Sequence, residues 1–382
     1  MTTLSPAELD RSHREIQSLA REFAQGEIAP HAAEWGAAKH VPVDVLRRMG
    51  ELGFLGVIIP EEYGGAGLDY VCLALVMEEI AAADAGTSAG LAVQNSLGAT
   101  PIVRHGSEEQ KREHLPPLAS GEWMAAYALS EPDAGSDAAA LRTAAHRDGD
   151  DWVVSGAKMW ITNGGFADLF VLFARTGGEG SRGVSAFLTR PGPGLHVGKE
   201  IPKMGLHTSS TVELAFDGHR VPADRMLGAE GEGLRIALST LDSGRIVVAA
   251  QACGIARAAL EAAVAYAGER RAFGGPIARF QGVQFPIADV AARLDAARLL
   301  TLHAARLRDA GEPHTAAGAK AKLFASQVAV EAADACVQAM GGYGYSAEMP
   351  AERFYRDAKI TQIYEGTSEI QRLVIARDLW GD

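Results

Sequence analysis

Residues 233–268 have the sequence GLRIALSTLDSGRIVVAAQACGIARAALEAAVAYAG, which decides the fold expected for the C-terminal half of the chain. The stretch is rich in Ala, Leu and Arg, and its apolar residues recur at helical spacing over more than the length of an ordinary helix. Similar segments cover residues 281–310, 315–340 and 367–379. Four such helices joined by short loops predict an antiparallel four-helix bundle.

The region before this bundle has a different texture. Between residues 123 and 226, short runs rich in β-branched and aromatic residues alternate with turn residues such as Asp148-Gly149-Asp150. The runs expected to form strands are Trp123–Leu129, Asp151–Ile161, Leu169–Ala174, Val184–Leu188 and Thr211–Phe216. Because no helix of 10–15 residues separates them, we expect a small antiparallel barrel or sandwich, not a parallel sheet.

The first third of the chain has helical character. Ser5-Pro6-Ala7-Glu8 has the pattern of a capping box with proline at the first helical position, and it predicts a helix to about Gln25. Ser107-Glu108-Glu109-Gln110 repeats the pattern before a segment expected to end near Pro116-Pro117, and residues 69–83 also have helical spacing. The prediction is an α+β multidomain protein with a helical N-terminal domain (1–122), a β-barrel (123–226) and a helical bundle (227–382).

Size and charge restrict the function. The chain has 382 residues, which exceeds the roughly 250–300 residues that one core usually supports. Its net charge of −12 argues against a nucleic-acid-binding surface. The uncharged apolar stretch between Arg245 and Arg257 is too short to span a bilayer, and the N-terminus lacks a signal-peptide core. Three widely spaced cysteines in apolar surroundings predict buried, reduced thiols, so we expect a cytoplasmic protein that does not bind membranes.

Two stretches of the middle region could contact a ligand. Residues 127–137 (YALSEPDAGSD) run from a strand into a turn that could be an ordinary surface turn, or could present backbone N–H groups and hydroxyls, with Gly135 permitting close approach. Trp160 and Thr162 are two positions apart in a predicted strand, so both side chains lie on one face. They could be core residues, or an aromatic plane and a hydroxyl that meet one planar ligand.

Three stretches of the C-terminal region allow the same choice between structure and function. Arg270-Arg271 could be a solvated helix end or a pyrophosphate partner. The glycines of residues 338–345 (QAMGGYGY) could cap a helix or bind a ligand through their backbone. Glu365, on a glycine-flanked loop, could interact with the dipole of the last helix or act as a general base.

Taken together and in this order, the motifs resemble the acyl-CoA dehydrogenases, over nearly the whole chain. The matching stretches are ALSEPDAGSD (128–137), RRAFGGPIARFQGVQF (270–285) and IYEGTSEIQRLVIAR (363–377). The resemblance implies FAD as cofactor, an acyl-CoA substrate, an electron-transferring flavoprotein as electron acceptor, and a homotetramer.

The resemblance also assigns individual residues, none of them a metal ligand. Those expected to bind FAD are Tyr127, Leu129, Ser130, Ser136, Trp160, Thr162, Arg270, Phe273, Gln281, Gln338, Gly341, Gly342, Thr367 and Glu369. Within this set, residues 270–342 are expected to hold the ADP half of an FAD that is bound mainly by a neighbouring subunit. Those expected at the thioester are Ser136, Asp242, Arg245 and Gly366.

By the same resemblance, Glu365 removes the α-proton of the thioester and a hydride passes to flavin N5, which gives a trans-2-enoyl-CoA. Isovaleryl-type relatives carry the base at the position of Gly244 instead, so the lone acid at Glu365 is similar to short- and medium-chain members. A short or short branched acyl group is slightly favoured. The alternatives are an oxidase, an enzyme for acyl groups on a carrier protein, and a non-catalytic DNA-binding relative, which the acidic charge disfavours.

Overall fold

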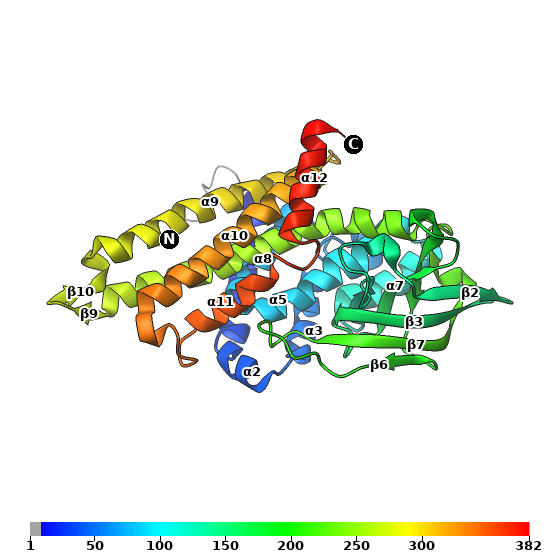
Figure 1. Cartoon of the computed structure of the whole chain (residues 1–382), viewed down its shortest axis with the longest axis horizontal. Coiled ribbons are helices and arrows are strands. Elements are labelled where there is room, and N and C mark those ends of the chain that lie inside the picture. Colours follow the sequence, from blue (N-terminus) through cyan, green and yellow to red (C-terminus); the bar gives the residue numbers. More distant parts are fainter. Residues whose placement is uncertain (1–8, 382) are drawn as a thin grey trace.

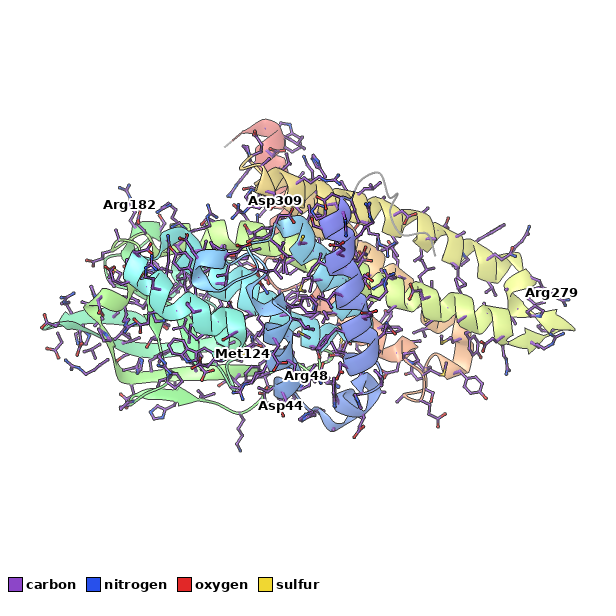
Figure 2. The ribbon with its side chains drawn as sticks, turned by 180° about the vertical axis from the view of Figure 1, so that it is seen from behind. Asp44, Arg48, Met124, Arg182, Arg279 and Asp309 are labelled. Carbon is purple, nitrogen blue, oxygen red and sulfur yellow. The ribbon has the colours of Figure 1, made fainter. Side chains whose placement is uncertain are left out.

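Long helices occupy the C-terminal region of the computed structural model, which describes residues 9–381 (Figure 1). Three of them, α8 (Gly233–Glu269), α9 (Gln281–Asp309) and α10 (Thr315–Met340), run alongside one another. Their bounds agree with the predicted segments to within one residue. The small hairpin of β9 (Arg271–Ala272) and β10 (Gly275–Pro276) joins α8 to α9 at one extremity of the molecule, and Figure 2 labels Arg279 beside it.

The fourth predicted helix forms, but it lies differently from the other three. α12 (Ser368–Trp380) contacts α10 and points away from the bundle in Figure 1, and Gln371 is its one buried residue. A helix that the sequence patterns did not reveal, α11 (Ala351–Ile360), packs instead against α8 and α10 and buries Phe354 and Ala358. It was missed because it is short and half of its residues are charged.

The middle region is an eight-stranded sheet with the order β6-β7-β3-β2-β4-β5-β8 and with β1 beside β4. Its strands are β1 (Ala125–Ala128), β2 (Ala144–Asp148), β3 (Asp151–Thr162), β4 (Leu169–Arg175), β5 (Val184–Thr189), β6 (Leu195–Val197), β7 (Thr211–Pro222) and β8 (Met226–Leu227). Most pairs are antiparallel as predicted, but β1 is parallel to β4, and β2 meets β4 in parallel at one residue pair. The strands β2, β6 and β8 were not expected, because they are short or mostly exposed.

Packing on both sides explains why every residue of β4 except the last is buried. Phe170 and Leu172 face the core of the sheet together with Trp152 of β3. Val171 and Phe173 face the other way, into a core that includes residues of α7 and α8. Since successive side chains of a strand alternate, two covered faces require a continuous apolar run. This packing holds the end of β1 close to α8.

The helical N-terminal region contains α1 (Arg11–Phe23), α2 (Ala32–Ala38), α3 (Val43–Glu51), α4 (Tyr70–Ala83), α5 (Ala85–Ala92), α6 (Thr100–His105) and α7 (Glu108–Ser120). The predicted capping box of Ser107 and Gln110 is present, and Asp69 caps α4. The predicted box at Ser5 lies outside the described residues, and α1 begins at Arg11 with Asp10 as its cap. The expected end of α7 near Pro116 is wrong, because packing of Leu115 and Leu118 carries the helix through both prolines.

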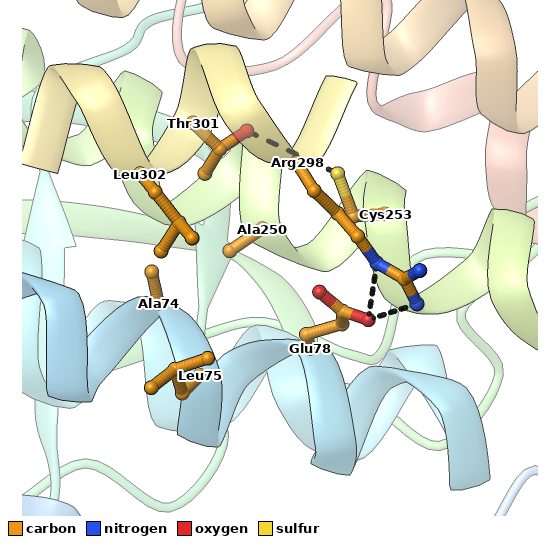
Figure 3. Close-up of a pocket in the computed structure, with 8 residues that line it drawn as sticks. All are labelled: Ala74, Leu75, Glu78, Ala250, Cys253, Arg298, Thr301 and Leu302. Atoms are coloured by element: carbon orange, nitrogen blue, oxygen red, sulfur yellow. Dashed lines mark hydrogen bonds and ion pairs between the residues drawn. The ribbon is translucent and has the colours of Figure 1, made fainter. Parts of the chain in front are cut away.

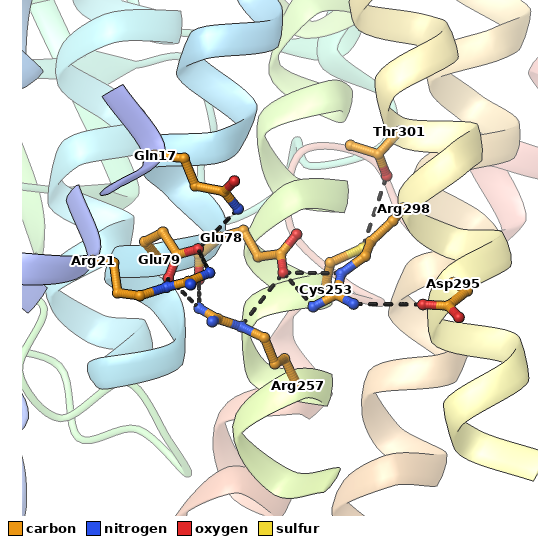
Figure 4. Close-up of polar contacts among 9 residues, drawn as sticks. All are labelled: Gln17, Arg21, Glu78, Glu79, Cys253, Arg257, Asp295, Arg298 and Thr301. Carbon is orange, nitrogen blue, oxygen red and sulfur yellow. Dashed lines mark hydrogen bonds and ion pairs between the residues drawn. The ribbon is translucent and has the colours of Figure 1, made fainter. Parts of the chain in front are cut away.

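Buried ion pairs join the N-terminal helices to the bundle (Figure 4). Arg298 of α9 donates to Glu78 of α4 over 2.6 Å, and Arg257 of α8 donates to Glu79 over 2.6 Å. Arg21 of α1 completes the cluster by donating to Glu79 over 2.7 Å. The cavity beside Glu78, whose lining residues are drawn in Figure 3, has a volume of about 10 Å³ and is too small for a substrate. Arg21 is partly exposed, but Glu78, Glu79, Arg257 and Arg298 are buried, so removal of one of these four would leave a buried charge uncompensated.

Burial also accounts for two expectations about composition. Cys72, Cys253 and Cys336 are buried and unpaired, as predicted. The uncharged stretch between Arg245 and Arg257 is too short to cross a membrane. The whole of α8 is long and apolar enough to do so, because its most apolar window has a mean hydropathy of 1.5. Since 83% of that window is buried inside the protein, α8 has the character of a core helix.

Candidate active site

Glu365 lies on the loop between α11 and α12, where the backbone is strained. Its φ angle is +52°, a left-handed value that residues other than glycine rarely adopt, and Gly366 follows with φ +94°. Thr367 then caps α12 by accepting a hydrogen bond from the Ile370 N–H. Strain of this kind persists where surrounding contacts hold it, and it concentrates at functional sites.

The carboxylate of Glu365 is isolated. Its Oε2 atom is buried, and within residues 9–381 it has no hydrogen-bond partner. Burial raises the pKa of Glu365 from its usual range to about 7, against the positive charges of Lys322 and Arg245, which lower it. A carboxylate that titrates near neutrality and makes no hydrogen bond there is free to accept a proton from a ligand.

Gly244 of α8 gives this carboxylate its space. A Cβ atom built on Gly244 would lie 2.0 Å from Glu365 Oε2 and 3.6 Å from Leu97 Cδ2. Only glycine therefore fits here while the Glu365 side chain keeps its position. Two positions that the sequence analysis treated as alternative sites for an acid, 121 residues apart, thus meet at one point of the fold.

Asp242 and Arg245, both expected at the thioester, flank Gly244 on α8. Arg245 donates to Asp242 Oδ1 over 2.7 Å, and Thr315 of α10 donates to Asp242 Oδ2 over 2.8 Å. The Arg245 Nε–H is buried and unpartnered within the described chain. Since an unpaired buried donor costs free energy, this N–H is a candidate contact for an acceptor on a ligand.

The end of β1 approaches the same site from the other side. The Tyr127 hydroxyl donates to the Ala237 carbonyl of α8 over 3.3 Å, and burial, together with the charge of Glu365, raises the pKa of Tyr127. Beyond β1, the chain turns at residues 131–134, and the buried Lys158 Nζ donates to the Leu129 carbonyl over 3.0 Å and to Glu131 Oε1 over 2.8 Å. These contacts fix the segment that includes Leu129 and leave Ser130 half-buried and Ser136 exposed.

Trp160 and Thr162 lie at the end of β3, on either side of Ile161, which belongs to the β core. A bulge between Lys158 and Ile161 gives Trp160 a φ of +64°, and its side chain is 56% exposed. Ile161 between them is buried. An exposed indole with a hydroxyl on the same face fits a planar ligand such as the isoalloxazine of FAD.

The residues expected to hold the ADP half of FAD gather around the C-terminal end of α8. Arg270 lies over the ring of Tyr343, with 5.7 Å from its guanidinium carbon to the ring centroid, and Phe273 is 89% exposed. The exposed residues near them are Gln281, Gln338, Gly341 and Gly342. Arg270 follows Gly244 by 26 positions, and at about 1.5 Å per residue α8 separates them by about 39 Å. Within this chain, Arg270 therefore lies far from the Glu365 carboxylate that Gly244 faces.

Thr367 and Glu369 take a third position, at the start of α12. Thr367 is half-buried beside Gly366, whereas the Glu369 side chain is exposed and accepts a hydrogen bond from Arg372 over 3.2 Å. Both therefore lie near the loop that carries Glu365, away from Arg270.

Four further residues of the site were given no role by the sequence patterns: Lys322 and Gln251 lie outside every quoted motif, and Tyr364 and Gln371 lie within the stretch 363–377 but were not singled out. Lys322 of α10 donates to the Tyr364 carbonyl over 2.8 Å and also to that of Gly366. The Tyr364 hydroxyl donates to Gln251 of α8, and Gln371 of α12 donates to the Gly366 carbonyl over 2.8 Å. The one sign in the sequence was that Lys322 lies on a helix face whose other residues are small and mostly apolar.

Comparison with known proteins agrees with this geometry. Family models for the N-terminal, middle and C-terminal domains of acyl-CoA dehydrogenases match residues 10–122, 126–219 and 231–380. The chain is 48% identical to the mitochondrial short-chain specific acyl-CoA dehydrogenase of Bos taurus, over 99% of this chain and 92% of that protein. It is 47% identical to an acyl-CoA dehydrogenase of Bacillus subtilis, over 96% and 97%.

Solved structures are equally similar. Butyryl-CoA dehydrogenase from Megasphaera elsdenii superposes with a TM-score of 0.95 at 43% identity, over 97% of this chain and 98% of that one. A chain in a structure described as the electron transferring flavoprotein of Acidaminococcus fermentans has a TM-score of 0.97 at 47% identity, with full coverage of both. The fold and these relatives define an oxidoreductase that acts on CH–CH bonds. More specifically, the chain belongs to the acyl-CoA dehydrogenase family.

Proposed function

We propose that this protein uses FAD to dehydrogenate a short-chain acyl-CoA to the trans-2-enoyl-CoA, with Glu365 as the base that removes the α-proton. The observation that carries the proposal is the buried Glu365 Oε2, which has no partner among residues 9–381 although its carboxylate titrates near neutral pH. A base kept free of competing hydrogen bonds in a water-poor site gains strength because its charged form is poorly solvated.

The other residues of the site position the reactants in this proposal. FAD, when bound, supplies the acceptor for the hydride that leaves the β-carbon. Trp160 and Thr162 would line its ring, and Ser130, Leu129 and Tyr127 would contact its pyrimidine side. Arg245 and Asp242 would orient the substrate, and the Glu365 backbone N–H would donate to the thioester oxygen as negative charge develops there.

The electron acceptor and assembly are parts of the same proposal. An electron-transferring flavoprotein would reoxidise the flavin, and a homotetramer would bring Arg270 of one subunit to the FAD of another. The separation of about 39 Å along α8 between Gly244, which faces Glu365, and Arg270 of the same chain supports the second point. We also propose a cytoplasmic location without membrane attachment, because the apolar part of α8 is 83% buried.

The test is anaerobic bleaching of the bound flavin by a panel of acyl-CoAs, for the wild type and Glu365→Gln. The variant should retain FAD and bind ligand, yet lose at least about 1,000-fold in the rate of flavin reduction, since general acid–base catalysis contributes about 10²–10⁴-fold. The wild-type rate should rise with pH through about 7, where Glu365 ionises.

Glu331→Gln is the matched control, because Glu331 is an exposed carboxylate that pairs with Arg293 away from the site. It should leave the rate unchanged. Reduction of Glu365→Gln at the wild-type rate would place the base elsewhere. Rapid peroxide formation in air would favour an oxidase, and reduction only by acyl groups on a carrier protein would change the substrate.

A further inference from the structure

Lys322 is a buried residue that contacts the loop carrying Glu365. It lies on α10 with 0% of its surface exposed, and its ammonium group donates to the carbonyls of Tyr364 and Gly366, the two residues on either side of Glu365. Among the described residues, its hydrogen bonds go to carbonyl oxygens, and the carboxylates of Glu365 and Glu369 act on it through charge alone. A buried ammonium without a contacting carboxylate is costly, so its position calls for an explanation beyond packing.

The backbone gives part of that explanation. Glu365 and Gly366 both have positive φ angles, of +52° and +94°, and a strained non-glycine residue costs about 1–3 kcal/mol unless its surroundings hold it. Lys322 donates hydrogen bonds to the carbonyls of the residues just before and just after Glu365. Gln371 also donates to the second of these, the Gly366 carbonyl. The loop conformation that aims Glu365 therefore depends on donors from α10 and α12.

Charge gives the other part. The positive charges acting on Glu365 come from Lys322 of α10 and Arg245 of α8, and both lower its pKa against the larger effect of burial. Glu365 in turn raises the pKa of Lys322, which burial lowers to about 8, and Glu369 of α12 acts in the same direction. The uncharged hydroxyls near Glu365 are those of Tyr127 and Tyr364, whose own pKa values are raised by burial.

We propose that Lys322 is a positioning residue for the dehydrogenation, which holds the two carbonyls beside Glu365 and places a fixed positive charge near that base. The inference rests on Glu365 being the base. Lys322 itself touches neither substrate nor cofactor in this proposal, and acts through the loop and through its charge.

The test compares Lys322→Met with the wild type by anaerobic flavin reduction from pH 5.5 to 9.5. Loss of the positive charge destabilises the carboxylate form of Glu365, so the acid limb of the rate profile should move upward by about one pH unit. Loss of the two donors should reduce the limiting rate by about 100-fold, because a misplacement near 1 Å has an effect of that size. The substrate concentration at half-maximal rate should change much less.

Lys320→Met is the matched control. Lys320 lies two residues away on the same helix, is exposed, and pairs with Asp378 over 3.2 Å. The same substitution there changes the net charge equally, and it should leave the pH profile and rate unaltered. Lys322→Arg, which keeps the charge, should keep the acid limb at the wild-type pH even where its rate is reduced.

The following results would overturn the proposed role of Lys322. A Lys322→Met enzyme whose acid limb stays at the wild-type pH would overturn the proposal, as would a loss of rate explained entirely by lower FAD content. If Lys322→Met, Lys322→Gln and Lys322→Arg all fail to fold with flavin, Lys322 is a folding residue and the proposal is wrong. Failure of the proposed function would look different, because the wild type would then show no flavin reduction or Glu365→Gln would remain active.

Discussion

Replacing Gly244 with alanine should place a methyl group against the proposed base. The new Cβ would lie 2.0 Å from Glu365 Oε2, whereas non-bonded heavy atoms rest near 3.5 Å, so the carboxylate must withdraw by about 1.5 Å. A displacement of about 1 Å can reduce a rate by about 100-fold, and we expect at least that loss in flavin reduction by acyl-CoA. FAD content should be unchanged, since Gly244 is remote from Arg270.

The free energy of unfolding of Gly244→Ala should rise or stay constant, although its rate of flavin reduction falls. Gly244 lies inside α8, where exchange of glycine for alanine favours the helix by about 1 kcal/mol before any strain is counted. Gly268→Ala is the control, because Gly268 lies on the same helix and its Cβ would meet no atom within 4 Å. Stopped-flow reduction and thermal unfolding measure both quantities. A Gly244→Ala enzyme that reduces its flavin at the wild-type rate would refute the position or the role assigned to Glu365.

Two further predictions concern the cofactor and the β region. Arg270→Ala should weaken FAD retention without altering the pH profile of the loaded enzyme, because the Arg270 guanidinium is exposed and can pair with phosphate. Gel filtration with absorbance detection measures the retained FAD, and full retention would count against this role. Lys158→Met should destabilise the protein by about 3–5 kcal/mol in urea unfolding, since Glu131 loses its buried partner; a cost below about 1 kcal/mol would show that the pair contributes little.

Local rules were sufficient for much of the secondary structure. The Ser107 capping box, the helix over residues 69–83 and the long apolar helices of the C-terminal region depend on residues within a few positions of one another, and all three predictions are confirmed. Predictions failed where distant contacts decide. α7 continues through Pro116 because its apolar residues are packed, and β1 pairs in parallel with β4, a contact between strands that the β2–β3 hairpin separates along the chain.

The sequence alone determined the order of helical and β regions, the motifs that carry the family resemblance, and the choice of Glu365 as the candidate base. The tertiary structure decided what surrounds that carboxylate. Gly244, Lys322 and Arg245 reach it from two other helices, and no spacing along the chain encodes their approach. The physical reason is that the pKa of a buried acid depends on desolvation and on charges brought close through space, and both exist only once the helices have packed.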